Sequence, residues 1–201
     1  MKILLLYPNT YGMNMIPPAF GIFTAILKNA GHELQLFDTT DYVEDDRDFD
    51  KEKSDNLNAR PINDFSKLEE AKIFSDPNED FNKIVASFKP NLIAVSVVED
   101  MFPRAIELLS ALNGTRPTVV MGGVFPTFAA DVAYDNSEGF IDYILKGEGE
   151  RTILEFCEKL EKNESLESID GIYYVENNVF SGDRVINNSL PSPNPISDIP
   201  I

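Results

Sequence analysis

The chain has 201 residues, and 43% of them are hydrophobic, which is enough to bury the core of one domain with an appendage. Lys and Arg number 17 against 34 Asp and Glu, which gives a formal net charge of −17. A phosphate backbone or an anionic membrane would be repelled by this charge, so we expect neither nucleic acid nor a membrane as a partner.

The inventory of metal-binding side chains is small. Cys157 is the single cysteine, so this chain cannot form an internal disulfide, a thiolate zinc site or an iron–sulfur cluster from its own residues. His32 is the single histidine, and because it stands just before a predicted strand we expect a capping or core contact rather than a metal ligand. No apolar run has the length of a signal-peptide core or a membrane span, so a cytoplasmic protein is expected.

Strand and helix patterns alternate through the first 165 residues. Apolar runs predict strands at 3–7, 33–38, 92–98, 118–121 and 143–145. Helical spacing of apolar residues predicts helices at about 17–31, 81–88, 105–112, 127–134 and 150–160. Strands separated by helices predict an α/β fold with a doubly wound open parallel sheet, Rossmann-like or flavodoxin-like, with right-handed crossovers.

Three other segments depart from this alternation. Residues 39–80, within the main domain of 1–165, are predicted to be an acidic insertion. Residues 166–189 are predicted to form a C-terminal β-hairpin whose strands meet across Asn177-Asn178. The Pro-rich tail of 190–201 is typical of an extended linker.

The loops at the carboxyl ends of four predicted strands carry unusual residues, and these ends share one edge of a parallel sheet, where ligands bind. Paired glycines at Gly122-Gly123 allow a ligand to approach the backbone closely, and the Ser96 hydroxyl can hydrogen-bond a polar group. The alternative is that the glycines only form tight turns. The predicted site therefore lies at this edge, with Gly122-Gly123 at its centre.

Several common uses of this fold lack their motifs. No Gly-x-Gly-x-x-Gly follows the first strand and no Gly-x-x-x-x-Gly-Lys-Ser/Thr occurs, so neither usual phosphate-binding loop is present. A phosphoacceptor domain would place carboxylates after the first strand, where Tyr7-Pro8-Asn9 has none. Carboxylates stand in the later loops, but no His or Cys accompanies them, and those at the start of the last helix fit equally well as charges at its positive end. No catalytic residue and no metal ligand is predicted.

An ordered set of segments resembles a known family, the cobalamin-binding N-terminal domain of class B radical S-adenosylmethionine enzymes. The resemblance spans nearly the whole chain, and it depends on the order and spacing of the segments. These are Lys2 to Pro8, Pro17-Pro18, Ala30-Gly31-His32-Glu33, Pro90 to Ser96, Val120 to Thr127, and Asp142 to Glu150.

The resemblance implies where a cofactor would lie. Ser96, Gly122 and Gly123 would line a slot for the nucleotide tail of cobalamin, and the loop from Gly147 to Glu150 would close it. Another branch of cobalamin proteins carries Asp-x-His-x-x-Gly after the first strand, with the His on cobalt, whereas this chain has Pro8 to Gly12 there. Base-off, His-off cobalamin is therefore implied, with its lower face met by the loop from Asn9 to Met15. The residues predicted to contact the cofactor are Pro8, Asn9, Thr10, Tyr11, Pro17, Ser96, Val97, Val98, Glu99, Asp100, Gly122, Gly123, Val124, Phe125, Pro126, Thr127, Gly147, Glu148, Gly149 and Glu150.

The resemblance also implies a partner. The catalytic half of the family carries Cys-x-x-x-Cys-x-x-Cys for a 4Fe-4S cluster and uses S-adenosylmethionine, and this motif is not in the chain. The implied protein is therefore not catalytic alone. It would be a fragment whose linker leads to a radical S-adenosylmethionine domain that performs methyl transfer or related radical chemistry. Two alternatives stay open: a non-catalytic interaction module that kept the fold but lost the cofactor, and a flavodoxin-like binder of flavin or nucleotide.

Overall fold

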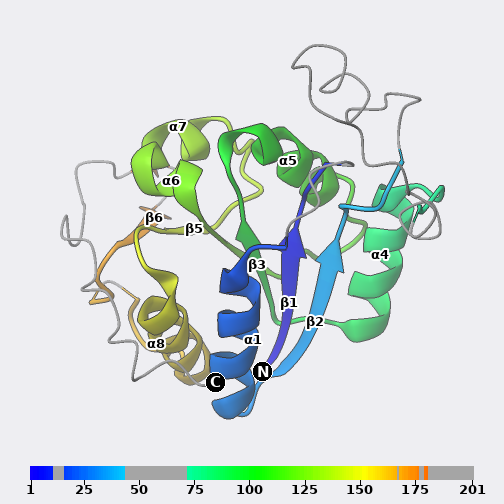
Figure 1. The fold of residues 1–201 in the computed structure, drawn as a ribbon. Helices are drawn as coiled ribbons and strands as arrows, with labels where there is room; N and C mark the ends of the chain where they lie inside the picture. The colour runs from blue at the N-terminus through cyan, green and yellow to red at the C-terminus, as the bar shows by residue number, and fades with distance from the viewer. Residues whose placement is uncertain (11–15, 44–71, 167, 177–178, 181–201) are drawn as a thin grey trace, which may run out of the picture.

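The structure is a computed structural model that describes residues 1–10, 16–43, 72–166, 168–176 and 179–180 (Figure 1). Its strands are β1 (Lys2–Tyr7), β2 (Glu33–Asp38), β3 (Leu92–Ser96), β4 (Thr118–Gly122), β5 (Tyr143–Leu145), β6 (Ile172–Glu176) and β7 (Val179–Phe180). Its helices are α1 (Pro18–Asn29), α4 (Pro77–Phe88), α5 (Phe102–Ser110), α6 (Val124–Phe128), α7 (Ala130–Asp135) and α8 (Gly149–Lys162), with a 3₁₀ turn at Glu99–Met101.

The strands form one sheet with the order β2-β1-β3-β4-β5-β6-β7. The pairs from β2 to β5 are parallel, and β6 and β7 are added antiparallel beyond β5. The predicted doubly wound α/β fold is confirmed. Chain order changes direction between β1 and β3, and such a switch point is where open α/β sheets bind ligands.

Ring contacts show which helices cover which face of the sheet. Tyr7 of β1 packs on Phe20 of α1 with ring centroids 5.1 Å apart, and Tyr143 of β5 packs on Phe156 of α8 at 5.2 Å. These helices lie side by side in front of the sheet in Figure 1. Phe37 of β2 instead meets a ring of α4, so α4 covers the opposite face, which α5 shares by right-handed crossover.

The core is densest where the sheet is covered on both sides. Ile3, Leu4 and Leu6 of β1 are fully buried, and so are Leu92 and Ile93 of β3. Each such side chain contributes about 1.5–3 kcal/mol of hydrophobic stabilisation relative to an exposed one. A run of apolar residues without alternation is the expected sequence of a strand buried on both faces.

Local sequence explains where the helices begin and end. The Asp76 carboxylate accepts from Asn78 N at 2.8 Å and Pro77 opens α4, while Gly31 follows α1 with φ of +87°. The helix predicted at 127–134 is two short helices, because the backbone at Ala129 leaves helical geometry (φ −139°, ψ 54°). The strand predicted at 92–98 ends at Ser96.

The predicted insertion and hairpin are described only in part. Residues 77–80 of the 39–80 segment belong to α4, and Tyr42 pairs with Ile73 in an isolated parallel bridge, while 44–71 lie outside the described residues. β6 and β7 are antiparallel partners, and 181–201, including the predicted linker, lie outside the described residues. Within the described ranges, no helix combines the length and apolar character that crossing a membrane requires.

Candidate functional site

The loops that follow β1, β3, β4 and β5 lie along one edge of the sheet, because these strands are parallel neighbours. We call this the carboxyl edge. It carries Pro8–Thr10, Val97–Asp100, Gly123–Thr127 and Lys146–Glu150. The predicted site residues are therefore brought together, except for Tyr11, which lies outside the described residues.

Gly123 is the most constrained residue of this edge. Its φ is +110°, and a Cβ atom there would lie 2.4 Å from Val97 O and 2.8 Å from Val97 N. Only glycine fits such a contact and such a conformation. At Gly123 it is therefore the chain's own backbone, at Val97 just after β3, that approaches closely.

Gly122 has a different environment. A Cβ atom at Gly122 would meet Leu145 O at 3.6 Å, an ordinary contact distance, and its φ is not positive. The register pairs Gly122 with Ser96, so both lie on the same face of the sheet. The missing side chain of Gly122 leaves space, whereas its backbone conformation does not require glycine.

The Thr127 hydroxyl joins two loops of the carboxyl edge. Its Oγ1 donates to Gly123 O at 2.7 Å and accepts from Gly147 N at 3.0 Å. Because one hydroxyl acts as donor and acceptor, the loop after β4 and the loop after β5 are linked through a single side chain. Thr127, one of the predicted site residues, thus holds the loops after β4 and β5 in position.

Small residues line the face of the central strands that points to α1 and α8. Ala94 and Ser96 of β3 and Gly122 of β4 lie on this face, in register with Leu5 and Tyr7 of β1. All three are only partly buried, whereas Ile93 and Val95 on the other face are 0% and 3% exposed. Ala94, Ser96 and Gly122 are therefore a group of small, partly exposed residues on the face of the sheet that α1 and α8 cover.

An aromatic ring of α1 meets the first residue of α8. A Cβ atom at Gly149, the first residue of α8, would lie 2.9 Å from Phe23 Cζ of α1. Phe23 is partly buried at this contact between the two helices. The sequence pattern predicts a helix over Phe23 but singles out neither Phe23 nor Ala94 as a site residue. The alternation of large and small residues from Ile93 to Ser96 is the available signal for Ala94.

Apolar side chains form an exposed rim above the strand ends. Val98, Val124 and Phe128 are 38%, 61% and 83% exposed. Phe125 instead packs on Phe102 of α5 at a ring distance of 5.2 Å, and Pro126 is buried. Some of the predicted site residues after β3 and β4, such as Val98 and Val124, therefore face outward. Others, such as Phe125 and Pro126, hold the loop against the fold.

The first loop is turned inward at Asn9 and outward at Thr10. Pro8 is buried, Asn9 is 2% exposed, and Asn9 Nδ2 donates to Thr40 Oγ1 at 2.9 Å. Thr10 is exposed, and Pro17 precedes the first residue of α1 and is half-buried. Thr10 is therefore the residue of this loop that is available to a ligand among those described.

The carboxylates of the edge show no catalytic arrangement. Glu99 and Asp100 are exposed on the 3₁₀ turn, and Glu148 precedes α8 without a side-chain capping bond. Glu150 lies in the first turn of α8, and its Oε2 is buried without a hydrogen-bond partner among the described residues. This position suits an interaction with the positive end of the helix.

Metal ligands and nucleophiles are located elsewhere. Among the described residues no group of three His, Cys, Asp or Glu side chains is arranged to hold a metal. His32 lies at the opposite edge, with Nδ1 3.2 Å from the Met1 ammonium group, and burial lowers its pKa. Cys157 is buried in the core, and this burial raises the pKa of its thiol to about 12.

The family comparison matches this part of the fold. Residues 69–156 match the B12 binding domain. Over these residues the chain is similar to that family. The resemblance found in the sequence is thereby confirmed, and the matched residues include Ser96, Gly122 and the loop from Gly147 to Glu150, while the first loop lies before them.

Solved structures share the fold of this chain. The chain superposes on the radical S-adenosylmethionine methyltransferase TsrM from Kitasatospora setae, solved with cobalamin and a 4Fe-4S cluster, with a TM-score of 0.64 and 19% identity over 88% of this chain and 27% of that one. It superposes on the cobalamin-dependent S-adenosylmethionine radical enzyme OxsB, solved with aqua-cobalamin and S-adenosylmethionine, with a TM-score of 0.53 and 16% identity over 88% of this chain and 21% of that one. These likenesses show the fold.

Two curated relatives match shorter stretches. An anaerobic magnesium-protoporphyrin IX monomethyl ester cyclase of Synechocystis sp. is 38% identical over 76 residues, which is 37% of this chain and 14% of the relative. An uncharacterized methyltransferase of Pyrococcus horikoshii is 29% identical over 100 residues, which is 49% of this chain and 22% of the relative. The chain thus spans less than a quarter of the length of these relatives.

Proposed function

We propose that this chain holds cobalamin at the carboxyl edge, with its nucleotide tail in a slot lined by Ala94, Ser96 and Gly122. The small, partly exposed residues on this face are the observation that carries this proposal. Small, partly exposed residues on two central strands leave space that large side chains fill on the other face. The Ser96 hydroxyl would hydrogen-bond a polar atom of the tail.

The exposed rim would support the corrin ring. Val98, Val124 and Phe128 present apolar surface above the strand ends, and an exposed group of apolar side chains at a loop edge is typical of a binding surface. A broad, largely apolar macrocycle suits such a surface. Gly123 and Thr127 hold the loops beneath it through backbone packing and the shared hydroxyl.

The cofactor would be bound base-off and His-off. His32, the single histidine, lies at the amino ends of the strands beside Met1 and is 6% exposed there, so it cannot supply a ligand at the carboxyl edge. A tail in the slot is withdrawn from the cobalt. The loop after β1, which begins at the buried Asn9, would then approach the lower face of the corrin.

The domain would serve a radical S-adenosylmethionine catalytic domain. TsrM and OxsB support this, because both are longer proteins named for that chemistry. Cobalamin, when bound, supplies a cobalt centre that can carry a methyl group. The contribution of this chain would be to bind and orient the cofactor, since the described residues of its carboxyl edge include no His or Cys.

The test compares cobalamin with cobinamide, which lacks the nucleotide tail. Purified protein is mixed with each corrinoid and desalted, and the retained absorbance is measured. Gly122→Val places methyl groups in the slot, so retention of cobalamin should fall while retention of cobinamide stays unchanged. Gly21→Val is the matched control, because a Cβ at Gly21 on α1 meets nothing within 4 Å.

Three outcomes would contradict the proposal. Wild-type protein that retains no corrinoid would support an interaction module that lost its cofactor, and retention of flavin instead would support a flavodoxin-like binder. Equal loss of both corrinoids in Gly122→Val would place the tail outside the slot.

A further inference from the structure

Buried polar side chains are concentrated at one place in the described structure. Of its five buried polar residues, three lie where β1 and β2 end: Asn9 is 2% exposed, Thr39 1% and Thr40 9%. Burying a polar group costs free energy unless it is hydrogen-bonded. A concentration of them beside the carboxyl edge therefore indicates a local requirement for fixed geometry.

These residues form a set that we call the Thr39 clamp: Asp38, Thr39, Thr40 and Asn9. Thr39 Oγ1 donates to Asn9 O at 2.6 Å, and Asn9 Nδ2 donates to Thr40 Oγ1 at 2.9 Å. Thr40 N and Thr40 Oγ1 both donate to Asp38 Oδ1, at 2.8 and 2.5 Å. The clamp thus holds Asn9 by its backbone and by its side chain.

The clamp lies beyond the regular pairing of the two strands. The β1–β2 register ends with Tyr7 opposite Asp38, and Thr39 N still donates to Tyr7 O at 3.1 Å. Asn9 lies past this point, where a parallel ladder would no longer hold it. The Thr39 hydroxyl therefore extends the attachment into the first loop of the carboxyl edge, and the exposed Thr10 follows directly.

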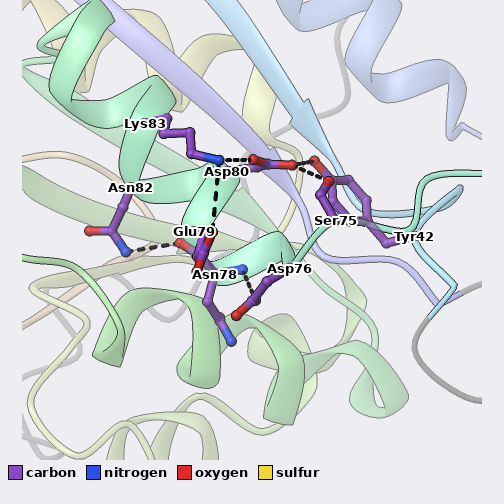
Figure 2. Close-up of polar contacts among 8 residues, drawn as sticks. All are labelled: Tyr42, Ser75, Asp76, Asn78, Glu79, Asp80, Asn82 and Lys83. Atoms are coloured by element: carbon purple, nitrogen blue, oxygen red, sulfur yellow. Dashed lines mark hydrogen bonds and ion pairs between the residues drawn. The ribbon is translucent and has the colours of Figure 1, made fainter.

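The clamp is anchored to helix α4 through Tyr42. Thr39 O accepts from Tyr42 N at 3.1 Å, and the Tyr42 hydroxyl donates to Asp80 Oδ2 at 3.3 Å. Figure 2 shows that Asp80 is also bonded by Ser75 and by Lys83 Nζ, the latter at 2.8 Å. Burial and the Asp80 carboxylate raise the pKa of Tyr42 to about 12, so its hydroxyl stays a donor at neutral pH.

We propose that Thr39 is a positioning residue for the cofactor: its hydroxyl fixes the backbone at Asn9, and thereby the place of the exposed Thr10, which would contact the corrin. This inference rests on the proposed function. It differs from the tail slot, because the loop after β1 would contact the corrin and not the tail. Loss of the Thr39 hydroxyl should therefore weaken cobalamin and cobinamide alike.

The experiment uses two nearly isosteric variants. Thr39→Val keeps the branched shape and loses the hydroxyl, whereas Thr39→Ser keeps the hydroxyl and loses a methyl group. We expect Thr39→Val to weaken binding of both corrinoids by about tenfold, the scale of one hydrogen bond, and Thr39→Ser to bind within about twofold of wild type. Thr115→Val, in an exposed loop, is the control.

A second readout separates positioning from simple loss of stability. The paramagnetic resonance spectrum of bound cob(II)alamin reports the surroundings of the cobalt, and it should change in Thr39→Val but not in Thr39→Ser. Thermal unfolding of each variant without corrinoid measures the structural cost separately. Tyr42→Phe, which keeps the ring and loses the bond to Asp80, should show the same spectral change to a smaller degree.

The outcomes distinguish the two proposals. If wild-type protein retains no corrinoid, the proposed function and the positioning role both fail. If wild type binds and Thr39→Val matches it in affinity and spectrum, only the positioning role is overturned. The same conclusion follows if Thr39→Ser is as weak as Thr39→Val, because the methyl group and not the hydroxyl would then matter.

Discussion

The two edges of the parallel sheet are stabilised in different ways. At the carboxyl edge, backbone packs on backbone: Gly123 lies against Val97, and Thr127 links two loops. At the opposite, amino edge, charged side chains pair with one another. Arg116 holds Asp142 through two bonds of 2.7 Å, and the Met1 ammonium group bonds Glu161 Oε1 at 2.5 Å.

This difference shows which edge still has surface that is free to bind a ligand. The amino edge does have a groove of about 540 Å³ beside α4. Three of its polar residues are already bonded, since Asn82 accepts from Asn113 N at 2.8 Å and Lys83 contacts Asp80. The carboxyl edge instead leaves Val124 and Phe128 exposed. Unused apolar surface therefore lies at the carboxyl edge.

The sharpest way to break the carboxyl edge is Gly123→Ala. The new Cβ would be forced to 2.4 Å from Val97 O at a φ of +110°, so we expect a loss of more than about 3 kcal/mol in the free energy of unfolding. Gly114→Ala is the matched control, because its φ is +83° but nothing lies within 4 Å. It should cost only about 1–2 kcal/mol. Equal costs by denaturant unfolding would show that the Val97 contact is unimportant.

The amino edge should respond to Asp142→Asn. Asp142 accepts from Arg116 and from Val119 N at 2.8 Å, linking the starts of β4 and β5. The Arg116 and Asp142 side chains are 25% and 34% exposed, so we expect the free energy of unfolding to fall by about 1–2 kcal/mol. Glu107→Gln, which breaks an exposed pair with Arg104, should have little effect. Corrinoid retention should not change, and a large change would contradict the separation of the two edges.

The smallest expected effect is the pH dependence contributed by His32. Burial and the Met1 ammonium group hold its pKa below the usual 6.5, against a smaller opposing effect of Glu161. The folded state therefore favours neutral His32. The stability that the neutral imidazole contributes is complete above about pH 6.5 and is lost as the pH falls through the lowered pKa. His32→Gln should flatten the unfolding free energy against pH in this range. A difference between wild type and variant that is constant with pH would refute the shift.

The sheet could be predicted from sequence because its signals are local. Unbroken apolar runs such as Ile3 to Tyr7 mark strands buried on both faces, and Gly31 marks a helix end. The edge on which the site residues gather follows from parallel topology alone. These features need no knowledge of which side chains touch.

Contacts between distant residues could not be predicted in this way. Thr39 and Asn9 are ordinary polar residues in sequence, and only the folded chain shows that both are buried and bonded. The same holds for Gly149 and Phe23, whose contact depends on how α8 lies on α1. Even Gly122 and Gly123, adjacent and identical in type, have different functions because one faces the slot and the other faces Val97.

The link made by Thr127 also has a consequence for local opening of the domain. The Gly147 amide donates to a side-chain oxygen rather than to a strand, and Thr127 N donates to Gly123 O at 3.2 Å. The Gly147 amide proton can exchange with solvent only when its bond to Thr127 Oγ1 breaks. In amide hydrogen exchange the amide protons of Gly147 and Thr127 should therefore become labile together, and the Gly147 amide, although it lies in a loop, should show the protection usually found inside a sheet.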